Sequence, residues 1–237
     1  MIRTRPTLVL YARLPRAGAV KTRMQPFLRA REALELHQAM LEDSLRLLRW
    51  AAERAGARPV LAFSEAWEPE ADGAPASLWR AAGGIDRLPQ RGGPLGERLR
   101  NTLSDLRAAG EGEVVIFGSD SPTLPPVWLE AACEALSGRA GVVLGPALDG
   151  GYYLVGTGPG AAVPFEAIPW GTDRALLQTL RVLRSTGTRP ALLPPWYDVD
   201  RPDDLGRVRR DLSAVPGFAP ERTAAFIERL ASTGRLR

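Results

Sequence analysis

The sequence contains few residues of the types that most often carry nucleophilic or metal chemistry. Among 237 residues there is one cysteine, Cys133, one histidine, His37, and one lysine, Lys21. A single cysteine excludes an intramolecular disulfide, and one histidine with one cysteine excludes a His/Cys zinc site. The same scarcity argues against a Ser-His-Asp triad. Any metal ion bound here therefore needs oxygen ligands, as Mg²⁺ and Mn²⁺ do.

Local patterns give structural roles to two of these rare residues. Cys133 falls within an apolar helical pattern, where a buried structural thiol is expected. His37 lies in a long amphipathic segment, so we expect it on a helix surface. Neither residue is predicted to be catalytic.

Long apolar runs and basic clusters are also absent. No run approaches the roughly 18 apolar residues of a membrane span, so we expect none. The net charge is only +4, because 27 acidic residues nearly balance 31 basic ones. Without a basic stretch interleaved with aromatics, no nucleic-acid partner is expected. Residues 1–6 lead directly into the first predicted strand and leave no room for a signal peptide, so a cytoplasmic location is expected.

Short apolar runs alternate with helical patterns, which is typical of a parallel sheet covered by helices. Strands are predicted at 7–12, 59–63, 114–118, 142–145 and 152–155, with a weaker one at 191–193. Helices are predicted at 29–55, 95–109, 126–136, 173–185, 202–212 and 220–231. Residues 64–91 are the least regular and predict a loop with one short element. The chain therefore predicts a single α/β domain over 1–237, with a core at about 7–213 and a helical tail at 214–237.

The only lysine follows the first predicted strand, in a loop that contains Pro15, Gly18 and the triplet Lys21-Thr22-Arg23. A compact ammonium next to a bidentate guanidinium suits a polyphosphate. The alternative interpretation is an exposed basic turn. The position of the loop at the end of a strand favours the phosphate site.

Two aspartates follow predicted strands or precede predicted helices. Asp120 comes directly after the strand at 114–118, where the carboxyl end of a strand could present it to Mg²⁺ or Mn²⁺. Asp200 precedes the helix that begins near Pro202 and could complete a metal site. For both residues a helix or turn cap is the structural alternative.

Asp149-Gly150-Gly151-Tyr152 lies between two predicted strands. On local grounds a hairpin turn explains it. The functional alternative is that the glycines let a substrate lie against the backbone, while Asp149 accepts a hydrogen bond or a proton.

Taken together, these motifs resemble the GT-A-fold nucleotide-diphospho-sugar transferase superfamily. The chain is most similar to the bacterial glycosyltransferase-like group (DUF2064-like) that is related to molybdenum-cofactor guanylyltransferases and 2-phospholactate guanylyltransferases. The matching segments also include Gln90, the run from Gly93 to Arg98, and Trp170-Gly171-Thr172-Asp173. The match covers about residues 7–210 and implies a Rossmann-like GT-A fold with a mostly parallel sheet.

The resemblance implies a role for each matching residue. The nucleotide and its phosphates would be bound by Ala12, Arg13, Gly18, Lys21, Thr22, Arg23, Gln90, Arg98 and Ser119. Mg²⁺ or Mn²⁺ would be bound by Asp120 and Asp200, with Asp198 as the second choice to Asp200. The acceptor would contact Gly150, Gly151, Tyr152 and Trp170. The candidate catalytic residues are Asp149 and Lys21.

The expected activity is a metal-dependent glycosyl transfer from a nucleotide-diphosphate sugar to a small-molecule acceptor. The alternative is a nucleotidyltransferase that joins an NTP to a phosphorylated small molecule and releases pyrophosphate. A non-catalytic nucleotide-binding protein is the third hypothesis. Arg13 stands where the group often has lysine, and the Gly-rich first loop of sugar-nucleotide pyrophosphorylases is missing. The sequence leaves the oligomeric state open, a homo-oligomer included.

Overall fold

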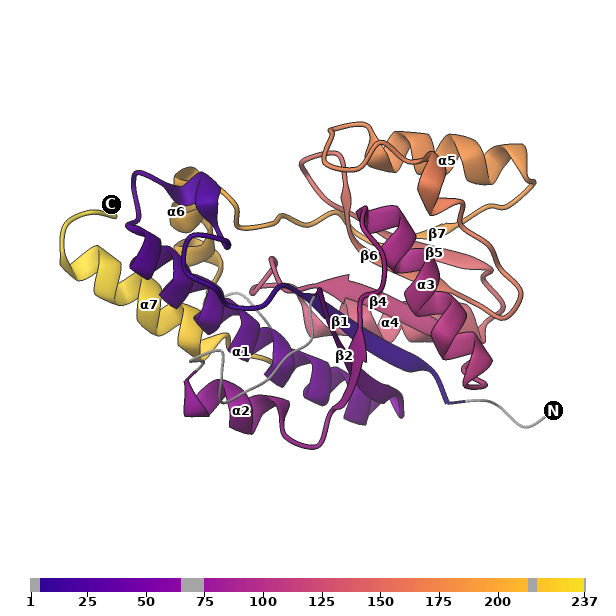
Figure 1. The fold of residues 1–237 in the computed structure, drawn as a ribbon, viewed down its shortest axis with the longest axis horizontal. Coiled ribbons are helices and arrows are strands. Elements are labelled where there is room, and N and C mark those ends of the chain that lie inside the picture. The colour runs from indigo at the N-terminus through magenta and orange to yellow at the C-terminus, as the bar shows by residue number, and fades with distance from the viewer. Residues whose placement is uncertain (1–4, 65–74, 213–216, 237) are drawn as a thin grey trace.

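The computed structural model describes residues 5–64, 75–212 and 217–236 (Figure 1). Its strands form one seven-stranded sheet in the order β3-β2-β1-β4-β6-β5-β7. In chain order the strands are β1 (Thr7–Ala12), β2 (Arg58–Phe63), β3 (Asp86–Pro89), β4 (Val114–Gly118), β5 (Val142–Pro146), β6 (Tyr152–Thr157) and β7 (Ala191–Leu192).

Helices connect most of these strands. The α-helices of the described residues are α1 (Ala30–Ala55), α2 (Ala76–Ala82), α3 (Leu95–Ala108), α4 (Pro126–Ser137), α5 (Ala175–Ser185), α6 (Pro202–Asp211) and α7 (Glu221–Ser232). Two short 3₁₀ helices, η1 (Thr22–Met24) and η2 (Phe165–Ala167), lie in loops. Pro126 and Pro202 occupy the first turns of α4 and α6, where the missing N–H costs no hydrogen bond.

The sheet is parallel except at β6, which runs antiparallel to both β4 and β5. Strand β1 lies between β2 and β4 and is parallel to both. The connections that follow β1 therefore lead to strands on its two opposite sides, first β2 and later β4. At such a switch point a crevice forms beyond the carboxyl ends of the strands, here β1 and β4. This architecture confirms the predicted α/β class and its mostly parallel, Rossmann-like sheet.

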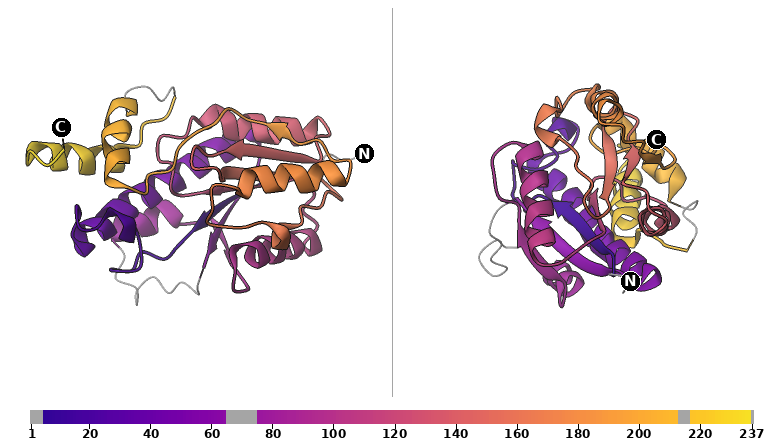
Figure 2. Two further views of the ribbon diagram at one scale, coloured as in Figure 1. Left: turned by 90° about the horizontal axis from the view of Figure 1, so that it is seen from above. Right: turned by 90° about the vertical axis from the view of Figure 1, so that its right-hand side faces the viewer.

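The alternation of side chains along the strands builds a core on each face of the sheet. Leu8 and Leu10 of β1 pack in the cluster that includes residues of α1, α2 and α4. Val9 faces the other way, into the cluster with residues of α3 and α5. Figures 1 and 2 show these two helical layers on either side of the sheet.

A third cluster joins the start of α1 to η1, α6 and α7. The buried carboxylate of Asp43, in the middle of α1, accepts hydrogen bonds from the backbone N–H groups of Arg222 and Thr223 at 3.2 and 2.7 Å. These are the first-turn donors of α7, so Asp43 caps that helix from a distant segment. The predicted boundary between a core at 7–213 and a tail at 214–237 remains a prediction.

The structure differs from the sequence-based expectation mainly in residues 75–91, and residues 65–74 of the segment predicted as irregular lie outside the described residues. Helix α2 and the edge strand β3 lie in this segment, where the sequence predicts one weak element. Three of the four residues of β3 are exposed, so its sequence lacks the apolar alternation that indicates a strand. No α-helix among the described residues is long and apolar enough to cross a bilayer.

Candidate functional site

A cavity of about 700 Å³ opens beyond the carboxyl ends of β1 and β4. Its walls come from the loop after β1, the start of α3, strand β6 and the segment before α6. It is lined by most of the predicted site residues: Ala12, Arg13, Lys21, Thr22, Arg23, Gln90, Arg98, Ser119, Asp120, Asp149, Tyr152, Trp170, Asp198 and Asp200. Gly18, Gly150 and Gly151 are not among the lining residues. Lys21 and Asp200, which are 179 positions apart in the chain, therefore meet in one place.

Lys21 is at the centre of the cavity's charged residues. Its ammonium donates hydrogen bonds to Asp120 Oδ1 at 2.6 Å, to the backbone oxygen of Val199 at 2.7 Å and to Asp200 Oδ1 at 3.2 Å. The Lys21 side chain is only 3% exposed. Its backbone has φ 49° and ψ 36°, a left-handed conformation that is uncommon outside glycine.

Lys21 and Asp120 keep each other charged, and Asp200 adds to the negative charge around the ammonium. Burial alone would lower the pKa of Lys21, but Asp120 and Asp200 hold that pKa above its ordinary value. Burial alone would raise the pKa of Asp120, but Lys21 holds it below its ordinary value. The side chains of Asp120 and Asp200 are 48% and 37% exposed, so both carboxylates still face the cavity.

Asp198 has a different environment. Its Oδ1 accepts a hydrogen bond of 2.6 Å from the hydroxyl of Ser121. Burial, with the negative charges of Asp120, Asp149 and Asp200, raises the pKa of Asp198 to about 7. Asp198 Oδ1 is thus held by the Ser121 hydroxyl, whereas Asp120 and Asp200 both reach the Lys21 ammonium.

The segment 196–200, which we call the strap, carries Asp198 and Asp200 across the end of the sheet. The backbone N–H of Val199 donates to the carbonyl oxygen of Asp120 at 2.8 Å, which fixes the strap to the loop after β4. The first residue of the strap is held by the segment after β5. The backbone N–H of Trp196 donates to the carbonyl oxygen of Pro146, and its carbonyl oxygen accepts from the backbone N–H of Leu148.

The buried hydroxyl of Thr123 joins the strap to the same loop. It donates to the hydroxyl of Tyr197 at 2.9 Å and accepts from the indole N–H of Trp196 at 3.3 Å. The ring of Trp196 also packs edge-on against Trp128 of α4. Thr123 thus contributes to the position of Asp200 relative to Asp120 without lining the cavity. Nothing in the local sequence distinguishes it from an ordinary turn threonine.

Arg13 and Arg23 of the first loop line the same cavity as the aspartates. Arg23 is 3.6 Å from Asp200 Oδ2 and is largely exposed, and Arg13 is exposed at the end of β1. Gly18 has φ 78°, so it serves the turn of the loop rather than the cavity wall. Arg13, Arg23 and the exposed Thr22 remain able to contact a phosphate.

Gln90 and Arg98 form a connected pair at the floor of the cavity. The buried amide of Gln90 donates to the carbonyl oxygens of Ala12 and Ala62, and its oxygen accepts from Arg98 at 3.1 Å. All the polar atoms of Gln90 are therefore engaged within the protein. Gln90 is therefore better placed to orient the Arg98 side chain than to contact a nucleotide directly.

The turn before β6 forms the opposite wall. Asp149 Oδ1 accepts a hydrogen bond of 2.9 Å from the N–H of Gly151, which is the turn interaction that the structural alternative predicts. Gly150 has φ 90°, and a Cβ there would lie 2.1 Å from the carbonyl oxygen of Asp173, so this glycine is required for packing. Trp170 donates its indole N–H to Phe165 and packs edge-on against Tyr152.

The donor set fits a metal ion only in part. Among the described residues, no group of three or more His, Cys, Asp or Glu side chains is arranged to hold a metal. Mg²⁺, however, is often bound by one or two carboxylates together with substrate phosphates. Asp120 and Asp200 provide that pair, so they fit a metal that is shared with a diphosphate.

His37 and Tyr11 also line the cavity and are missed by the sequence-based reasoning. His37 is buried rather than on the surface of α1, and its Nε2 lies 3.1 Å from the carbonyl oxygen of Arg13. It lines the cavity together with Asp120. Tyr11 of β1 lines the cavity, and its hydroxyl is hydrogen-bonded to the hydroxyl of Thr102 and to the backbone carbonyl oxygen of Arg98. Gly118, at the end of β4, lines it as well.

A family match and a similar solved structure confirm the resemblance that the sequence indicates. The chain belongs to the family DUF2064, described as "uncharacterized protein conserved in bacteria", and residues 47–172 match it. The comparison with curated proteins found no match.

Solved structures show the same relationship. A "putative nucleotide-diphospho-sugar transferase" from Desulfovibrio desulfuricans G20 is 25% identical, with a TM-score of 0.80 and 96% of both chains covered. A cytidylyltransferase from Leptospira borgpetersenii serovar Hardjo-bovis is 11% identical, with a TM-score of 0.53 and 98% of this chain and 96% of that chain covered. The second similarity shows the fold alone.

Thr123→Val tests the connection between the strap and the loop after β4. The change leaves the Tyr197 hydroxyl and the Trp196 indole without this partner, which should lower the free energy of unfolding by about 1–3 kcal/mol. Because Asp200 then loses its fixed position, affinity for nucleotide should also fall several-fold at temperatures well below unfolding. Thr123→Ser should restore both quantities. Unchanged nucleotide affinity in a destabilised Thr123→Val protein would limit Thr123 to a role in stability.

Proposed function

We propose that this protein is a metal-dependent transferase that moves a sugar from a nucleotide-diphosphate donor to a small-molecule acceptor. The observation that carries the proposal is the meeting of Lys21, Asp120 and Asp200 in one cavity at the switch point of the sheet. Ligands of open α/β sheets bind at this point. The 25% identity with the Desulfovibrio protein, over nearly the full length of both chains, supports the donor class.

The charges in the cavity suit a diphosphate that arrives with a cation. Asp120 and Asp200 alone would repel the phosphates, whereas Arg13, Lys21 and Arg23 attract them. Mg²⁺ or Mn²⁺, when bound, would supply the charge that stabilises the leaving nucleoside diphosphate. In this proposal Asp120 and Asp200 hold the metal, and the arginines hold phosphate oxygens through bidentate contacts.

The acceptor belongs, in this proposal, at the wall formed by Asp149, Tyr152 and Trp170. Asp149 uses Oδ1 in its turn, and Oδ2 has no hydrogen bond among the described residues. This second oxygen can accept the proton of an acceptor hydroxyl. The edge-on rings of Tyr152 and Trp170 add apolar surface to the same cavity, which suits the body of a small organic acceptor.

The activity is tested with purified protein and Mn²⁺ in two sets of reactions. One set contains nucleotide-diphosphate sugars with candidate acceptors, and the other contains NTPs with phosphorylated acceptors. We expect release of a nucleoside diphosphate in the first set. Release of pyrophosphate in the second set alone would instead establish a nucleotidyltransferase. If no nucleotide raises the melting temperature with or without metal, the protein is not a nucleotide-binding enzyme.

Asp120→Asn tests the role of the carboxylate pair. The amide has nearly the same shape but lacks the charge, so the metal should no longer strengthen nucleotide binding. We expect a loss of about tenfold or more in nucleotide affinity in the presence of Mn²⁺, measured by calorimetry, because a charged contact contributes about 1.5–3 kcal/mol. Asp203→Asn is the matched control, since Asp203 is exposed at the start of α6. Equal metal dependence in both variants would contradict the assignment.

Gly118→Val tests whether the donor lies against the end of β4. A Cβ at position 118 meets no heavy atom within 4 Å, and Gly118 has no positive φ. The side chain therefore enters open space at the cavity wall, and the melting temperature should change little. Nucleotide affinity should fall by about tenfold or more, with a smaller loss for Gly118→Ala. Wild-type affinity in both variants would place the nucleotide elsewhere.

A further inference from the structure

All three hydrogen-bond donors of the only lysine are occupied within the protein. An ammonium has three N–H groups, and Lys21 directs them to Asp120, Asp200 and the carbonyl of Val199. No donor remains for a phosphate in this arrangement. The phosphate-binding role that the resemblance implies therefore requires the ammonium to exchange partners.

The ammonium also occupies the position between the two carboxylates that best fit a metal. Asp120 Oδ1 and Asp200 Oδ1 both contact Nζ, at 2.6 and 3.2 Å. A divalent cation bound by the same oxygens would lie within a few ångströms of this positive charge and be repelled by it.

We propose that Lys21 is a tethered cation that keeps a free metal ion out of this position, so that the site takes the metal together with a diphosphate. The diphosphate supplies new acceptors for the ammonium and releases Asp120 and Asp200. This inference rests on the proposed function and defines its ligand more closely, as a metal–diphosphate complex rather than a bare ion.

Energetics favour this coupling of the two ligands. Removing the ammonium from the carboxylates without a replacement would leave a nearly buried charge without a partner, which is strongly unfavourable. Phosphate oxygens compensate for that loss with charge-assisted hydrogen bonds. Metal and diphosphate therefore each make the binding of the other more favourable.

The single lysine allows a direct test on the wild-type protein. Labelling with ¹⁵N-lysine gives one side-chain NMR signal, that of Lys21 Nζ. We expect millimolar Mg²⁺ alone to leave this signal unchanged. Mg²⁺ with inorganic pyrophosphate, used as a diphosphate without a base, should shift it clearly. A shift with Mg²⁺ alone, or no shift when the complex binds, would overturn the inference.

A charge-removing variant provides an independent measurement that does not depend on activity. Lys21→Met should bind Mn²⁺ alone at least tenfold more tightly than wild type, as measured by the EPR signal of free Mn²⁺. Pyrophosphate should strengthen Mn²⁺ binding to wild type by about tenfold and to Lys21→Met much less. Lys21→Arg keeps the positive charge, so its affinity for Mn²⁺ alone should stay below that of Lys21→Met, as in wild type.

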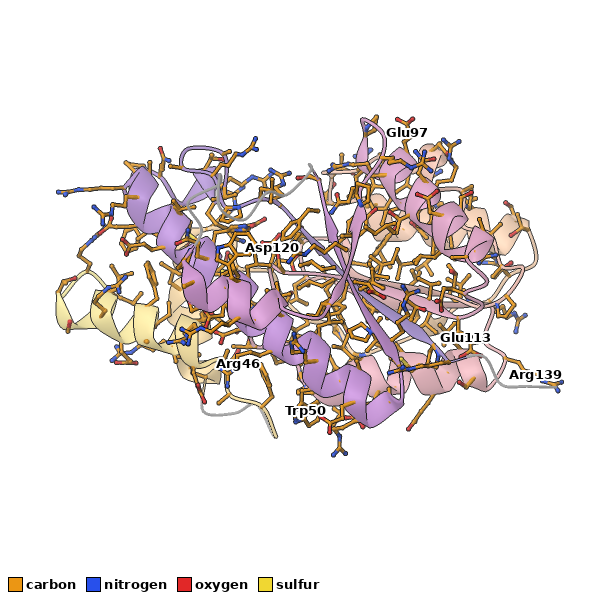
Figure 3. The ribbon with its side chains drawn as sticks, turned by 60° about the horizontal axis from the view of Figure 1, so that its bottom comes forward. Arg46, Trp50, Glu97, Glu113, Asp120 and Arg139 are labelled. Atoms are coloured by element: carbon orange, nitrogen blue, oxygen red, sulfur yellow. The ribbon has the colours of Figure 1, made fainter. Side chains whose placement is uncertain are left out.

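Arg139→Met is the matched control, because it removes one exposed positive charge far from Asp120 (Figure 3). Its Mn²⁺ affinity should equal that of wild type. Equal Mn²⁺ affinities for wild type and Lys21→Met would overturn the tethered-cation inference alone. If wild type binds neither Mn²⁺–pyrophosphate nor any nucleotide, the proposed function fails as well.

Discussion

The contact between the Lys21 ammonium, Asp120 and Asp200 is the interaction on which the cavity depends. It connects residues separated by 99 and 179 positions in the chain and holds a charged group at 3% exposure. Because the ammonium is nearly buried, removing its carboxylate partners would leave its charge without compensation. The loop after β1, the loop after β4 and the strap are therefore held at fixed distances from one another.

The sheet makes this contact possible. Because β1 and β4 are parallel neighbours, their carboxyl ends place the loop of Lys21 beside Asp120. The strap has no strand to align it, so individual hydrogen bonds set its position. The Val199 N–H donates to the Asp120 carbonyl oxygen, the Ser121 hydroxyl donates to Asp198, and the Thr123 hydroxyl donates to Tyr197. The parallel strands therefore bring Lys21 and Asp120 together, whereas specific hydrogen bonds position Asp198 and Asp200 in the strap.

This division explains what the sequence could predict. Buried parallel strands are apolar throughout, so β1 and β4 are predicted with their observed bounds, and Asp120 with its place at a strand end. The partners of Lys21, the burial of His37 and the role of Thr123 depend on contacts between distant segments. Local periodicity contains no information about such contacts. The short edge strand β3 is missed for a different reason, because its exposed residues lack an apolar pattern.

The chemistry of the ammonium also explains why lysine stands at this one position in a chain whose other basic side chains are arginines. Three oxygens from three directions converge on a single nitrogen. A tetrahedral ammonium can donate to all of them, whereas a planar guanidinium directs its N–H groups outward in a fixed fork. The same compact charge is what makes the ammonium comparable to a metal ion between two carboxylates. The fork of an arginine in the loop after β1 suits the oxygens of a phosphate, whereas the compact ammonium of lysine suits the position between Asp120 and Asp200.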